Sequence, residues 1–507
     1  MSGLFLVLLG IWHVELSLSP TLLPMQKVRE TLALILIGFL PFHAFFVTVG
    51  TRVILGPGDA PMGILALWKE ALLGVVLLLA FVEWFANPKK NRKIDVLDGC
   101  IVALLFLSLI IHASYQLPIT SYALGFRYDF IPLITFVVLR RVQWSEQFLP
   151  FAQRVLLGVS AVLAAYGLLT IVLPFAFFHW LGYSDLHSLY LPDKPLAAFQ
   201  LIEHSALRRI QSAMSGPNHF GLWLLLPLGV LLAQGAQRRW RAWTVGLFVL
   251  LGVALIFTFS RAAFLGGFVM LCVALFSAVS EKRLALSRKV IVAAGVSIVV
   301  LLGVLASVYP SVILRFSSSR GHLEKPLEAV QLMAEHPFGL GLGAAGPASN
   351  RLSEPCVFLG SDGDPSWAED RPELCVFLGD TQVQPPLPSG ELRPAGQPAG
   401  RACDCPLLTE NWYLQIGVEL GWIGFILFLL LTLLILKKLR VSDCWFLICS
   451  EPETRNEESE IRLAIFLSFL ALSIGSLFLH AWEDSAVAYS LWLLVAASLS
   501  RPRAESH

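Results

Sequence analysis

Four short polar segments carry the side chains of this sequence that are best suited to chemistry, and each of them interrupts or borders a run of apolar residues. They lie at 208–221, 258–266, 335–343 and 409–421. Guanidinium groups present planar forks of N–H donors that suit a phosphate or diphosphate, and a nearby carboxylate or imidazole can take a proton from a hydroxyl. The candidate side chains are Arg208, Arg209, His219, Arg261, His336, Glu410 and Asn411.

Each segment also has a purely structural explanation. Arg261 can extend to a lipid–water interface, and the two arginines of the first segment can line a solvated helix face. Pro217-Asn218 and Glu410-Asn411 are typical of helix starts, because Asn caps the first backbone amides and a carboxylate is favoured by the helix dipole. The glycine alternation of the third segment can form a flexible turn, and it is no dinucleotide-binding signal because no strand–turn–helix unit surrounds it. The histidines more often pack than catalyse in such positions.

The elements that must position these segments follow from composition. Of 507 residues, 56% are hydrophobic and only 14% are charged, and the mean hydropathy is +0.71. Soluble domains carry roughly 25% charged residues. This contrast, together with apolar runs of bilayer length, excludes a soluble multidomain enzyme, a disordered or fibrous chain and a secreted disulfide scaffold. The net charge of +1 argues against nucleic acid as a partner, because no basic excess exists to neutralise phosphates.

The apolar runs predict an all-α polytopic membrane protein with about twelve transmembrane helices. The opening block, 4–18, is short and contains His13 and Glu15. We therefore expect an interfacial or buried helix there in place of a removed signal peptide, with a thirteenth span as the alternative. The predicted spans are 31–50, 62–85, 97–114, 122–139, 154–178, 219–235, 242–258, 263–280, 289–308, 412–436, 463–480 and 485–499.

The distribution of basic residues predicts the orientation. With residues 1–30 in the cytoplasm, most Lys and Arg fall in inward-facing segments, where anionic lipid and the membrane potential retain them. Both termini are then cytoplasmic, and the four polar segments all lie at the outer face. Two long segments, 179–218 and 309–411, also face outward. Apart from those in the second long segment, the outward-facing basic residues are Arg52, Lys194, Arg208, Arg209 and Arg261.

This topology divides the chain into three parts. Residues 1–308 form a membrane domain of about nine spans, 309–411 form a large outward loop, and 412–507 hold the last three spans and a tail. The loop between the ninth and tenth spans is expected to begin with helices that rest on the membrane surface. Its later part, 351–408, is rich in Pro, Gly, Asp and Glu and is expected to be mostly irregular.

Four of the eight cysteines lie in this loop, where oxidation is permitted. We expect one or two disulfides with three pairings open, because the spacing forms no paired metal-binding pattern and no His lies among the cysteines. A metal site is the alternative. The run Cys-Val-Phe-Leu-Gly occurs at 356–360 and again at 375–379, and two copies are too few for a solenoid. The cysteines are Cys356, Cys375, Cys403 and Cys405.

The four polar segments can be interpreted together, because all of them are predicted to lie on the outer face of the membrane. Arginines, a glycine-rich backbone, amides at helix starts and an acidic base candidate all fall on the outer face, although they are far apart in sequence. Together they suit attack by a sugar hydroxyl on a glycosyl carbon whose leaving group is a lipid diphosphate. No nucleotide is available on that side, so the energy has to arrive in the donor's own diphosphate linkage. No cofactor or metal is expected.

At these residues the chain resembles the bacterial O-antigen ligase/polymerase family of polytopic inner-membrane glycosyltransferases. The resemblance covers about residues 200–350 and 405–500, whereas the first five spans match only in hydropathy and 351–408 has no counterpart. The matching motifs are Arg209 to Gly221, Phe257 to Gly266 (Thr-x-Ser-Arg), His336 to Gly343 (Pro-x-Gly-x-Gly-x-Gly), Glu410 to Gly421 (Glu-Asn-x-Tyr-Leu-Gln-x-x-x-Glu-x-Gly) and the turn from His480 to Asp484.

The resemblance implies an inverting, metal-independent transfer of a glycan from undecaprenyl diphosphate, in the bacterial inner membrane with the active site facing the periplasm. It assigns the diphosphate to Arg261 and, less directly, to Arg208 or Arg209. The implied partners are the lipid-linked donor, a glycan or lipid A–core acceptor, the bilayer and a chain-length regulator.

The resemblance also bears on the base. Ligase members typically have a His where this chain has Glu410, which favours a polymerase or an exopolysaccharide enzyme over a lipid A–core ligase. The base is then Glu410, His336 or His219, in that order, with Asn411 as the stabilising neighbour of Glu410.

Two other functions are weighed against this one. The first is a protein O-oligosaccharyltransferase of the same superfamily, whose acceptor is a Ser or Thr of a protein. The second is a flippase or transporter of lipid-linked glycan, which requires charges that line a path near mid-membrane. The charges available for such a path, Lys69, Glu70, Arg127 and Asp129, are too sparse for a transport route.

Overall fold

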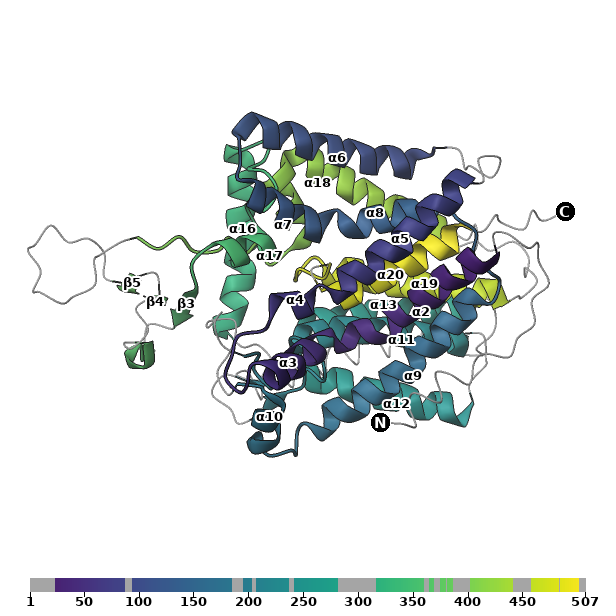
Figure 1. Cartoon of the computed structure of the whole chain (residues 1–507), viewed down its shortest axis with the longest axis horizontal. Coiled ribbons are helices and arrows are strands. Elements are labelled where there is room, and N and C mark those ends of the chain that lie inside the picture. The colour runs from purple at the N-terminus through teal and green to yellow at the C-terminus, as the bar shows by residue number, and fades with distance from the viewer. Residues whose placement is uncertain are drawn as a thin grey trace, which may run out of the picture.

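The computed structural model is a bundle of helices with a small sheet that projects from one end (Figure 1). It describes residues 23–86, 94–184, 195–202, 207–236, 241–280, 316–359, 364–368, 374–379, 381–385, 402–440, 457–482 and 484–500.

The structure is mostly helical (72%). Among the described residues, six helical segments are long and apolar enough to cross a bilayer, or seven if the bent pair α7 and α8 is one span. The chain is therefore an all-α polytopic membrane protein. The segments are Pro24–Ile54 (α2, Leu23–Phe39; η1, Leu40–Phe42; α3, His43–Ile54), Gly63–Ala86 (α4, Gly63–Ala66; α5, Trp68–Ala86), α6 (Val96–Tyr115), α7 (Ile119–Asp129) with α8 (Ile131–Leu139), α9 (Phe148–Leu169), α11 (Pro217–Ala236) and α18 (Trp412–Leu439). Four further helices pack with them: α12 (Ala242–Thr258), α13 (Arg261–Ser280), α19 (Glu457–Gly475) and α20 (Ser485–Ser500).

Each predicted span that falls on described residues overlaps a helix. The largest shifts concern 154–178, where α9 ends at Leu169 and the short α10 (Phe175–Leu181) follows, and 463–480, where α19 begins earlier. Three glutamates in the first turn of α19 explain the earlier start, because carboxylates stabilise a helix N-terminus. The opening block and the ninth span, 289–308, lie outside the described residues, so the total of twelve stays a prediction.

Helix α11 forms the centre of the bundle. It packs against α9, α12, α13, α19 and α20, and 83% of its apolar window is buried. Small residues let the neighbouring backbones approach closely: a Cβ on Gly229 would lie 2.3 Å from Ser468 Oγ, and one on Gly266 would lie 2.5 Å from the Ala471 carbonyl oxygen. Such contacts favour helix association in lipid, where apolar side chains gain nothing by leaving the tails.

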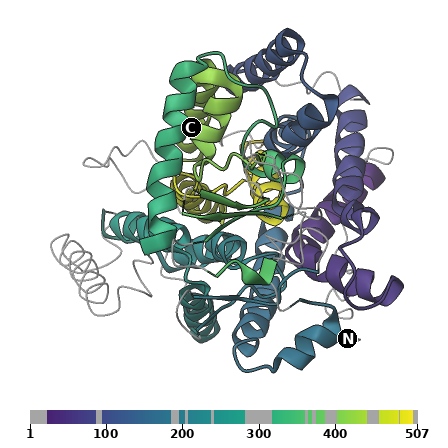
Figure 2. The same ribbon diagram turned by 90° about the vertical axis from the view of Figure 1, so that its left-hand side faces the viewer.

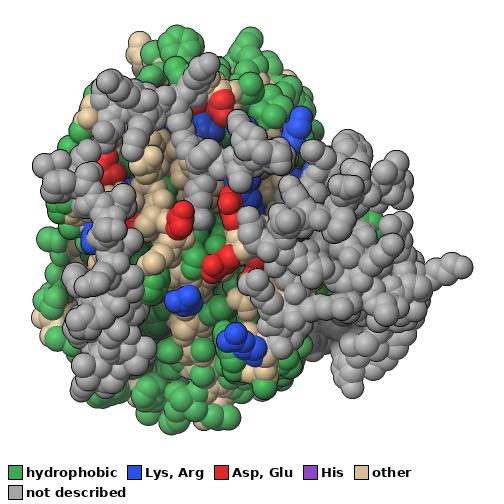
Figure 3. Space-filling view, turned by 90° about the vertical axis from the view of Figure 1, so that its right-hand side faces the viewer, with side chains coloured by type: hydrophobic (Ala, Val, Ile, Leu, Met, Phe, Trp, Pro, Cys, Tyr) green, Lys and Arg blue, Asp and Glu red, His purple; other side chains and the backbone are tan. Residues whose placement is uncertain are grey.

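One end of the bundle holds a network of buried ion pairs and is called the basic end here. Arg140 donates to Asp95 at 3.0 Å and to Asp98 at 2.5 Å, and Arg141 lies 2.8 Å from Asp98. Lys438 of α18 also contacts Asp95, so α6, α18 and the segment after α8 are tied together. Figure 3 shows this face, with charged side chains on it and hydrophobic side chains around its rim.

The opposite end carries the extramembrane elements. Helix α16 (Phe316–Glu335) runs across this end rather than along the bundle, beside α18, and the short α17 (Gly346–Leu352) follows (Figures 1 and 2). Helices that rest on the membrane surface were expected in this part of the chain; the structure has the helices, and their position on a membrane stays a prediction. Two short strands, β1 (Gln200–Leu201) and β2 (Arg208–Arg209), pair antiparallel and belong to the other long connection.

The prediction that 351–408 is mostly irregular was wrong for its described part. Strands β3 (Cys356–Leu359), β4 (Cys375–Leu378) and β5 (Thr381–Gln384) form a sheet beside the short helix η4 (Ser366–Ala368). The two Cys-Val-Phe-Leu copies are parallel neighbours with Cys356 opposite Cys375. Identical strands in register bring identical side chains together, as in the stacked rings of Phe358 and Phe377.

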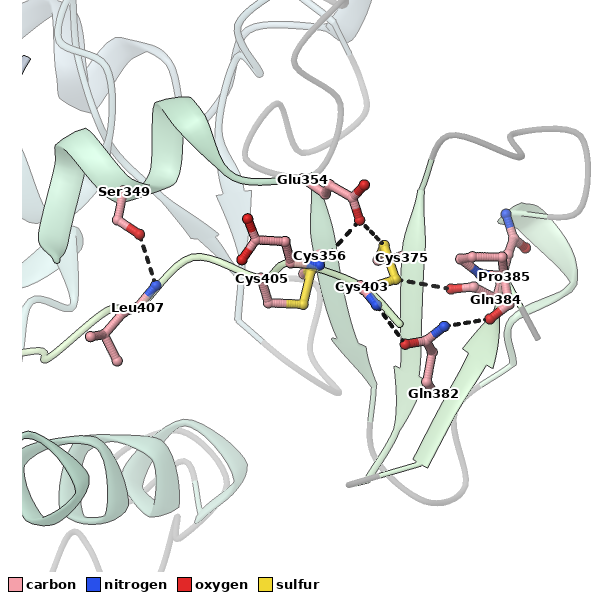
Figure 4. The surroundings of a disulfide bond; sticks show 11 residues. Ser349, Glu354, Cys356, Cys375, Gln382, Gln384, Pro385, Cys403, Cys405 and Leu407 are labelled. Carbon is pink, nitrogen blue, oxygen red and sulfur yellow. Dashed lines mark hydrogen bonds between the residues drawn. A yellow bond between two sulfur atoms is a disulfide. The ribbon is translucent and has the colours of Figure 1, made fainter. Parts of the chain in front are cut away.

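Two disulfides close this sheet, Cys356–Cys405 and Cys375–Cys403 (Figure 4). All four sulfurs are therefore oxidised and cannot serve as thiolate ligands, which overturns the metal alternative. The apolar core of the sheet is small, with Ala368, Leu374 and Val376 as its fully buried members. The sheet thus depends on its cross-links.

We expect the double variant Cys375→Ser/Cys403→Ser to lose the sheet while the helical bundle persists. A disulfide that closes a loop of this size contributes about 3–4 kcal/mol to the stability of the folded state, more than the burial of so small an apolar core contributes. Limited proteolysis should cut 354–405 much faster in the variant, with unchanged helical circular dichroism. Cys272→Ser, at a free cysteine of α13, is the control. Equal protection in both variants would contradict a disulfide-dependent sheet.

The basic end predicts a pH-dependent contribution from Asp95. Burial raises the pKa of this carboxyl, but hydrogen bonds from Arg140 and Lys438 outweigh burial and hold the pKa below its usual range. The contribution is therefore present above the ordinary value of 3.8 and is lost as the pH falls through the folded-state value. Asp95→Asn should lower the free energy of unfolding by about 1 kcal/mol at neutral pH.

The difference between wild type and Asp95→Asn should shrink as the pH falls below 3.8, in denaturant unfolding of the detergent-solubilised protein. Asp59→Asn, in an exposed loop at the other end, should show no such difference. A gap between wild type and Asp95→Asn that stays constant down to acid pH would count against the ion-pair network.

Candidate functional site

The four polar segments of the sequence meet at the end of the bundle opposite the basic end, called the site end here. Asn411 Nδ2 donates to the Leu477 carbonyl at 3.0 Å, and Trp412 N–H donates to the Ser476 carbonyl at 2.9 Å, so the start of α18 lies against the end of α19. The end of α19 also adjoins the start of α13, because a Cβ on Gly475 would lie 3.9 Å from the Ala262 carbonyl. Arg261 and Asn411 therefore lie at the same end of the molecule.

Arg208 holds the end of α9. Its Nη1 donates to the carbonyls of Thr170, Ile171 and Leu173, at 3.3, 3.3 and 2.7 Å, and its guanidinium lies 4.3 Å from the centre of the Phe199 ring. A cation at a helix C-terminus satisfies carbonyls that lack partners. This contact gives Arg208 a structural role that the sequence did not reveal.

Arg209 is also engaged by the protein. The side chain is buried, and its three nitrogens donate to the Thr258 carbonyl at 3.0 Å, to Gln200 at 3.0 Å and to Asn218 at 2.8 Å. It thereby joins the end of α12 to the start of α11. Neither of these two arginines lies on a solvated helix face, because both belong to β2.

Glu410 and Asn411 form the start of α18. Asn411 caps the helix by accepting from Leu414 N–H at 3.0 Å, as the structural explanation predicted. Glu410 has a left-handed backbone with φ of 50°, and its carboxylate lies 3.9 Å from Lys325 Nζ of α16. Glu410 is thus paired with a cation, and its pair links α16 to the start of α18.

The glycine segment is a fixed structure rather than a flexible turn. Gly339, Gly341 and Gly343 have φ of 88°, 94° and 84°, a backbone region that favours glycine. The segment docks where α18 breaks at Gly421, whose φ is 69° and ψ is −172°. We call residues 337–345 the glycine loop. His336, at its start, is exposed.

The hydrogen bonds of the glycine loop satisfy the backbone of the broken helix. Leu340 N–H donates to the Val418 carbonyl at 2.8 Å, Gly341 N–H donates to the Glu419 carbonyl at 2.9 Å, and Trp422 N–H donates to the Pro337 carbonyl at 3.1 Å. The approach is so close that a Cβ on Gly421 would lie 2.2 Å from the Pro337 carbonyl oxygen. The glycines therefore allow two backbones to pack closely at the point where the helix is interrupted.

His219 has the geometry expected of an oriented imidazole. It lies in the first turn of α11, with Nδ1 2.6 Å from Ser215 Oγ and 3.8 Å from Asp484 Oδ2. Asp484 in turn caps α20 by accepting from Ala486 N–H at 2.7 Å. The polar contacts that the structure shows between the ring and described residues run through Nδ1, so Nε2 is the nitrogen that could act on a ligand.

Sequence reasoning assigned no catalytic role to a cluster of cations beside His219. Lys69 Nζ donates to Ser485 Oγ at 2.8 Å, so Lys69 and His219 contact consecutive residues at the start of α20. Glu70 connects this cluster to α7, because its Oε1 accepts a hydrogen bond from Arg127 Nε at 3.0 Å. The same oxygen lies 4.0 Å from Lys69 Nζ.

A third cation reaches this cluster from the extramembrane part. Arg351 of α17 donates from Nε to the Tyr128 hydroxyl at 2.7 Å. Arg127, Arg351 and Asp484 all lie near enough to act electrostatically on Lys69. Charged residues inside predicted spans are costly and mark functional sites, and this signal was present in the sequence. The sequence suggested these charged residues only as a transport path, because the residues that they contact come from segments far apart in the chain.

The site end suits an anionic ligand. Helices α5, α11, α13, α18 and α20 all begin there, so their dipoles place partial positive charge at this end. The cluster of Lys69, Arg127 and Arg351 adds full charges, and His219 supplies a group that can accept a proton. No family model and no curated protein sequence matches this chain.

Gly343→Ala should disrupt the docking of the glycine loop. A Cβ there would lie 2.3 Å from the Ser121 carbonyl oxygen, and the left-handed backbone adds strain. We expect a loss of at least about 2 kcal/mol in the free energy of unfolding. Gly58→Ala is the matched control, because Gly58 has φ of 94° but nothing within 4 Å of its Cβ position. Gly58→Ala should therefore lose only the free energy of placing a Cβ on a left-handed backbone, about 1 kcal/mol. Equal losses would show that close packing of the loop contributes nothing.

Proposed function

We propose that this protein is a glycosyltransferase of the bacterial inner membrane that moves a glycan from undecaprenyl diphosphate to an acceptor sugar hydroxyl. One observation carries the proposal: the start of α20 joins an oriented imidazole and a cation cluster, through contacts of Asp484 with His219 and of Ser485 with Lys69. A base beside an anion site is what attack on a glycosyl diphosphate requires. The resemblance of the polar segments to the O-antigen ligase/polymerase family supports the same reaction.

The proposed topology has twelve spans, cytoplasmic termini and a periplasmic loop at 309–411. The described ion pairs are consistent with this orientation, because the end that we place in the cytoplasm holds Arg140, Arg141 and Lys438. The site end then faces the periplasm, where the lipid-linked donor is presented.

We assign the base to His219 rather than to Glu410 or His336. Glu410 is paired with Lys325, and His336 is exposed at the start of the glycine loop, whereas Asp484 and Ser215 fix the His219 ring. In the proposed step, Nε2 takes the proton of the acceptor hydroxyl as its oxygen attacks the anomeric carbon. The bond from that carbon to the diphosphate oxygen breaks, and the lipid diphosphate leaves with the electron pair.

The leaving diphosphate is assigned to Lys69, Arg127 and Arg261. The first two adjoin the His219 side of the site, and Arg261 begins α13 at the same end. Arg208 and Arg209 support the site instead, because their guanidinium groups hold helix ends together. In the resting protein, Glu70 balances the charge of Arg127.

The decisive experiment measures transfer in membranes from cells that lack the chromosomal copy. His219→Ala should lower the rate by about 10²–10⁴-fold, the usual effect of losing a general base. Lys69→Ala and Arg127→Ala should raise the KM for the lipid-linked donor by about 10-fold or more, because each removes a charge-assisted contact. Arg154→Ala, an exposed cation on α9 toward the basic end, is the control. Normal transfer by His219→Ala would refute the site.

The glycan product that is lost in the variants identifies the acceptor. Loss of long glycan ladders with single repeats retained identifies a polymerase, and loss of all capped lipid A identifies a ligase. Purified protein given lipid-linked glycan with either free glycan or a Ser-containing peptide separates both from a protein O-oligosaccharyltransferase. Among the described residues, the charges once weighed for a transport path are ion-paired or gathered toward the site end, which favours an enzyme over a flippase.

A further inference from the structure

A buried pair of carboxyl groups, Asp129 and Glu419, has no part in the proposed reaction. Asp129 ends α7, where α7 and α8 meet at an angle of 49°, and Glu419 lies just before the break of α18 at Gly421. The two residues are 2% and 0% exposed. The two carboxyl groups lie near enough to interact directly, across the contact of α7 with α18.

The other contacts of the pair come from neutral groups. Glu419 Oε1 accepts from Gly343 N–H at 2.9 Å and from Ala345 N–H at 3.3 Å. Asp129 Oδ1 accepts from Gln415 Nε2 at 3.2 Å, and Gln415 Oε1 lies 2.6 Å from His480 Nδ1. The remaining oxygens, Asp129 Oδ2 and Glu419 Oε2, are buried and have no hydrogen-bond partner among the described residues.

Within the described part of the chain, no Lys or Arg contacts either carboxyl group. The closest basic residue along α7, Arg127, is paired with Glu70. Among the described residues, His480 is a further titratable group near the pair: its Nδ1 contacts Gln415, which donates to Asp129.

Two ionised carboxylates can only accept, so these two carboxyl groups can satisfy their unpartnered oxygens with each other only if one of them carries a proton. Leaving both ionised in an apolar interior without a cation would cost several kcal/mol. We propose that Asp129 and Glu419 hold one proton between them, and that this shared proton fastens α7 to the break in α18 and positions the glycine loop. The inference does not depend on the proposed function, because the contacts exist whatever reaction the site end performs.

Replacing either carboxyl group by a neutral amide tests directly whether the pair shares a proton. In Glu419→Gln, the amide can still accept from Gly343 N–H and can donate to an ionised Asp129, so the variant should unfold at a denaturant midpoint close to that of wild type. Asp129→Asn should behave likewise. Glu419→Ala leaves two loop amides and a buried carboxyl without partners, so it should unfold earlier or fail to fold. Equal destabilisation by Glu419→Gln and Glu419→Ala would overturn the proposal.

Infrared difference spectroscopy supplies a readout that needs neither turnover nor the unstable variant. The spectrum of wild type minus that of Asp129→Asn/Glu419→Gln at neutral pH should contain the C=O band of one protonated carboxylic acid, shifted when water is exchanged for D₂O. Absence of that band overturns the proposal, and a carboxylate band that responds to Na⁺ would replace the proton by a cation. Either result leaves the glycosyltransferase assignment to be judged separately by the transfer assay.

Discussion

A break in a membrane helix exposes backbone groups that lipid cannot satisfy, and this constraint governs the part of the chain around α18. The break at Gly421 is tolerated because the glycine loop enters it and exchanges backbone hydrogen bonds with Val418, Glu419 and Trp422. Only glycine allows this approach, since a Cβ on Gly339 would lie 2.4 Å from the Glu419 carbonyl oxygen. The loop, the break and the buried carboxyl pair thus form one unit: removing any of them leaves polar groups of the others without partners.

The charged residues divide between the two ends of the bundle according to different physical demands. Among the described residues of the basic end, arginines pair directly with carboxylates, as in the contacts of Arg140 and Arg141 with Asp98. At the site end, cations from α5, α7 and α17 outnumber the carboxylates next to them, and several helices begin there. A network of direct ion pairs stabilises a fold, whereas cations near helix N-termini provide a surface that suits an anion.

The sequence predicted the spans that fall on described residues well, because long apolar runs have few other solutions in a protein of this composition. It also placed the polar segments at one end, since their positions follow from the alternation of spans. It could not identify the partners of Arg208 and Arg209, because those are helix-end carbonyls and amides whose position depends on packing. The break at Gly421 lies inside a single predicted span, 412–436, and the strands of the small sheet are too short to show a period. Residues of the cation cluster, such as Lys69 and Arg351, were missed because they are more than 200 positions apart from several of their neighbours.

The contact of α20 with both halves of the site has a consequence for biosynthesis. Lys69 and Ser485 are 416 positions apart in the chain, so the ribosome has to make all the residues between them before the two can meet. A nascent chain that has inserted its first helices carries the cations without the aspartate that orients the imidazole. If the proposed function holds, such a chain would be inert toward donor lipid until α20 enters the bilayer, and termination before α20 would yield a membrane-inserted protein without an assembled centre.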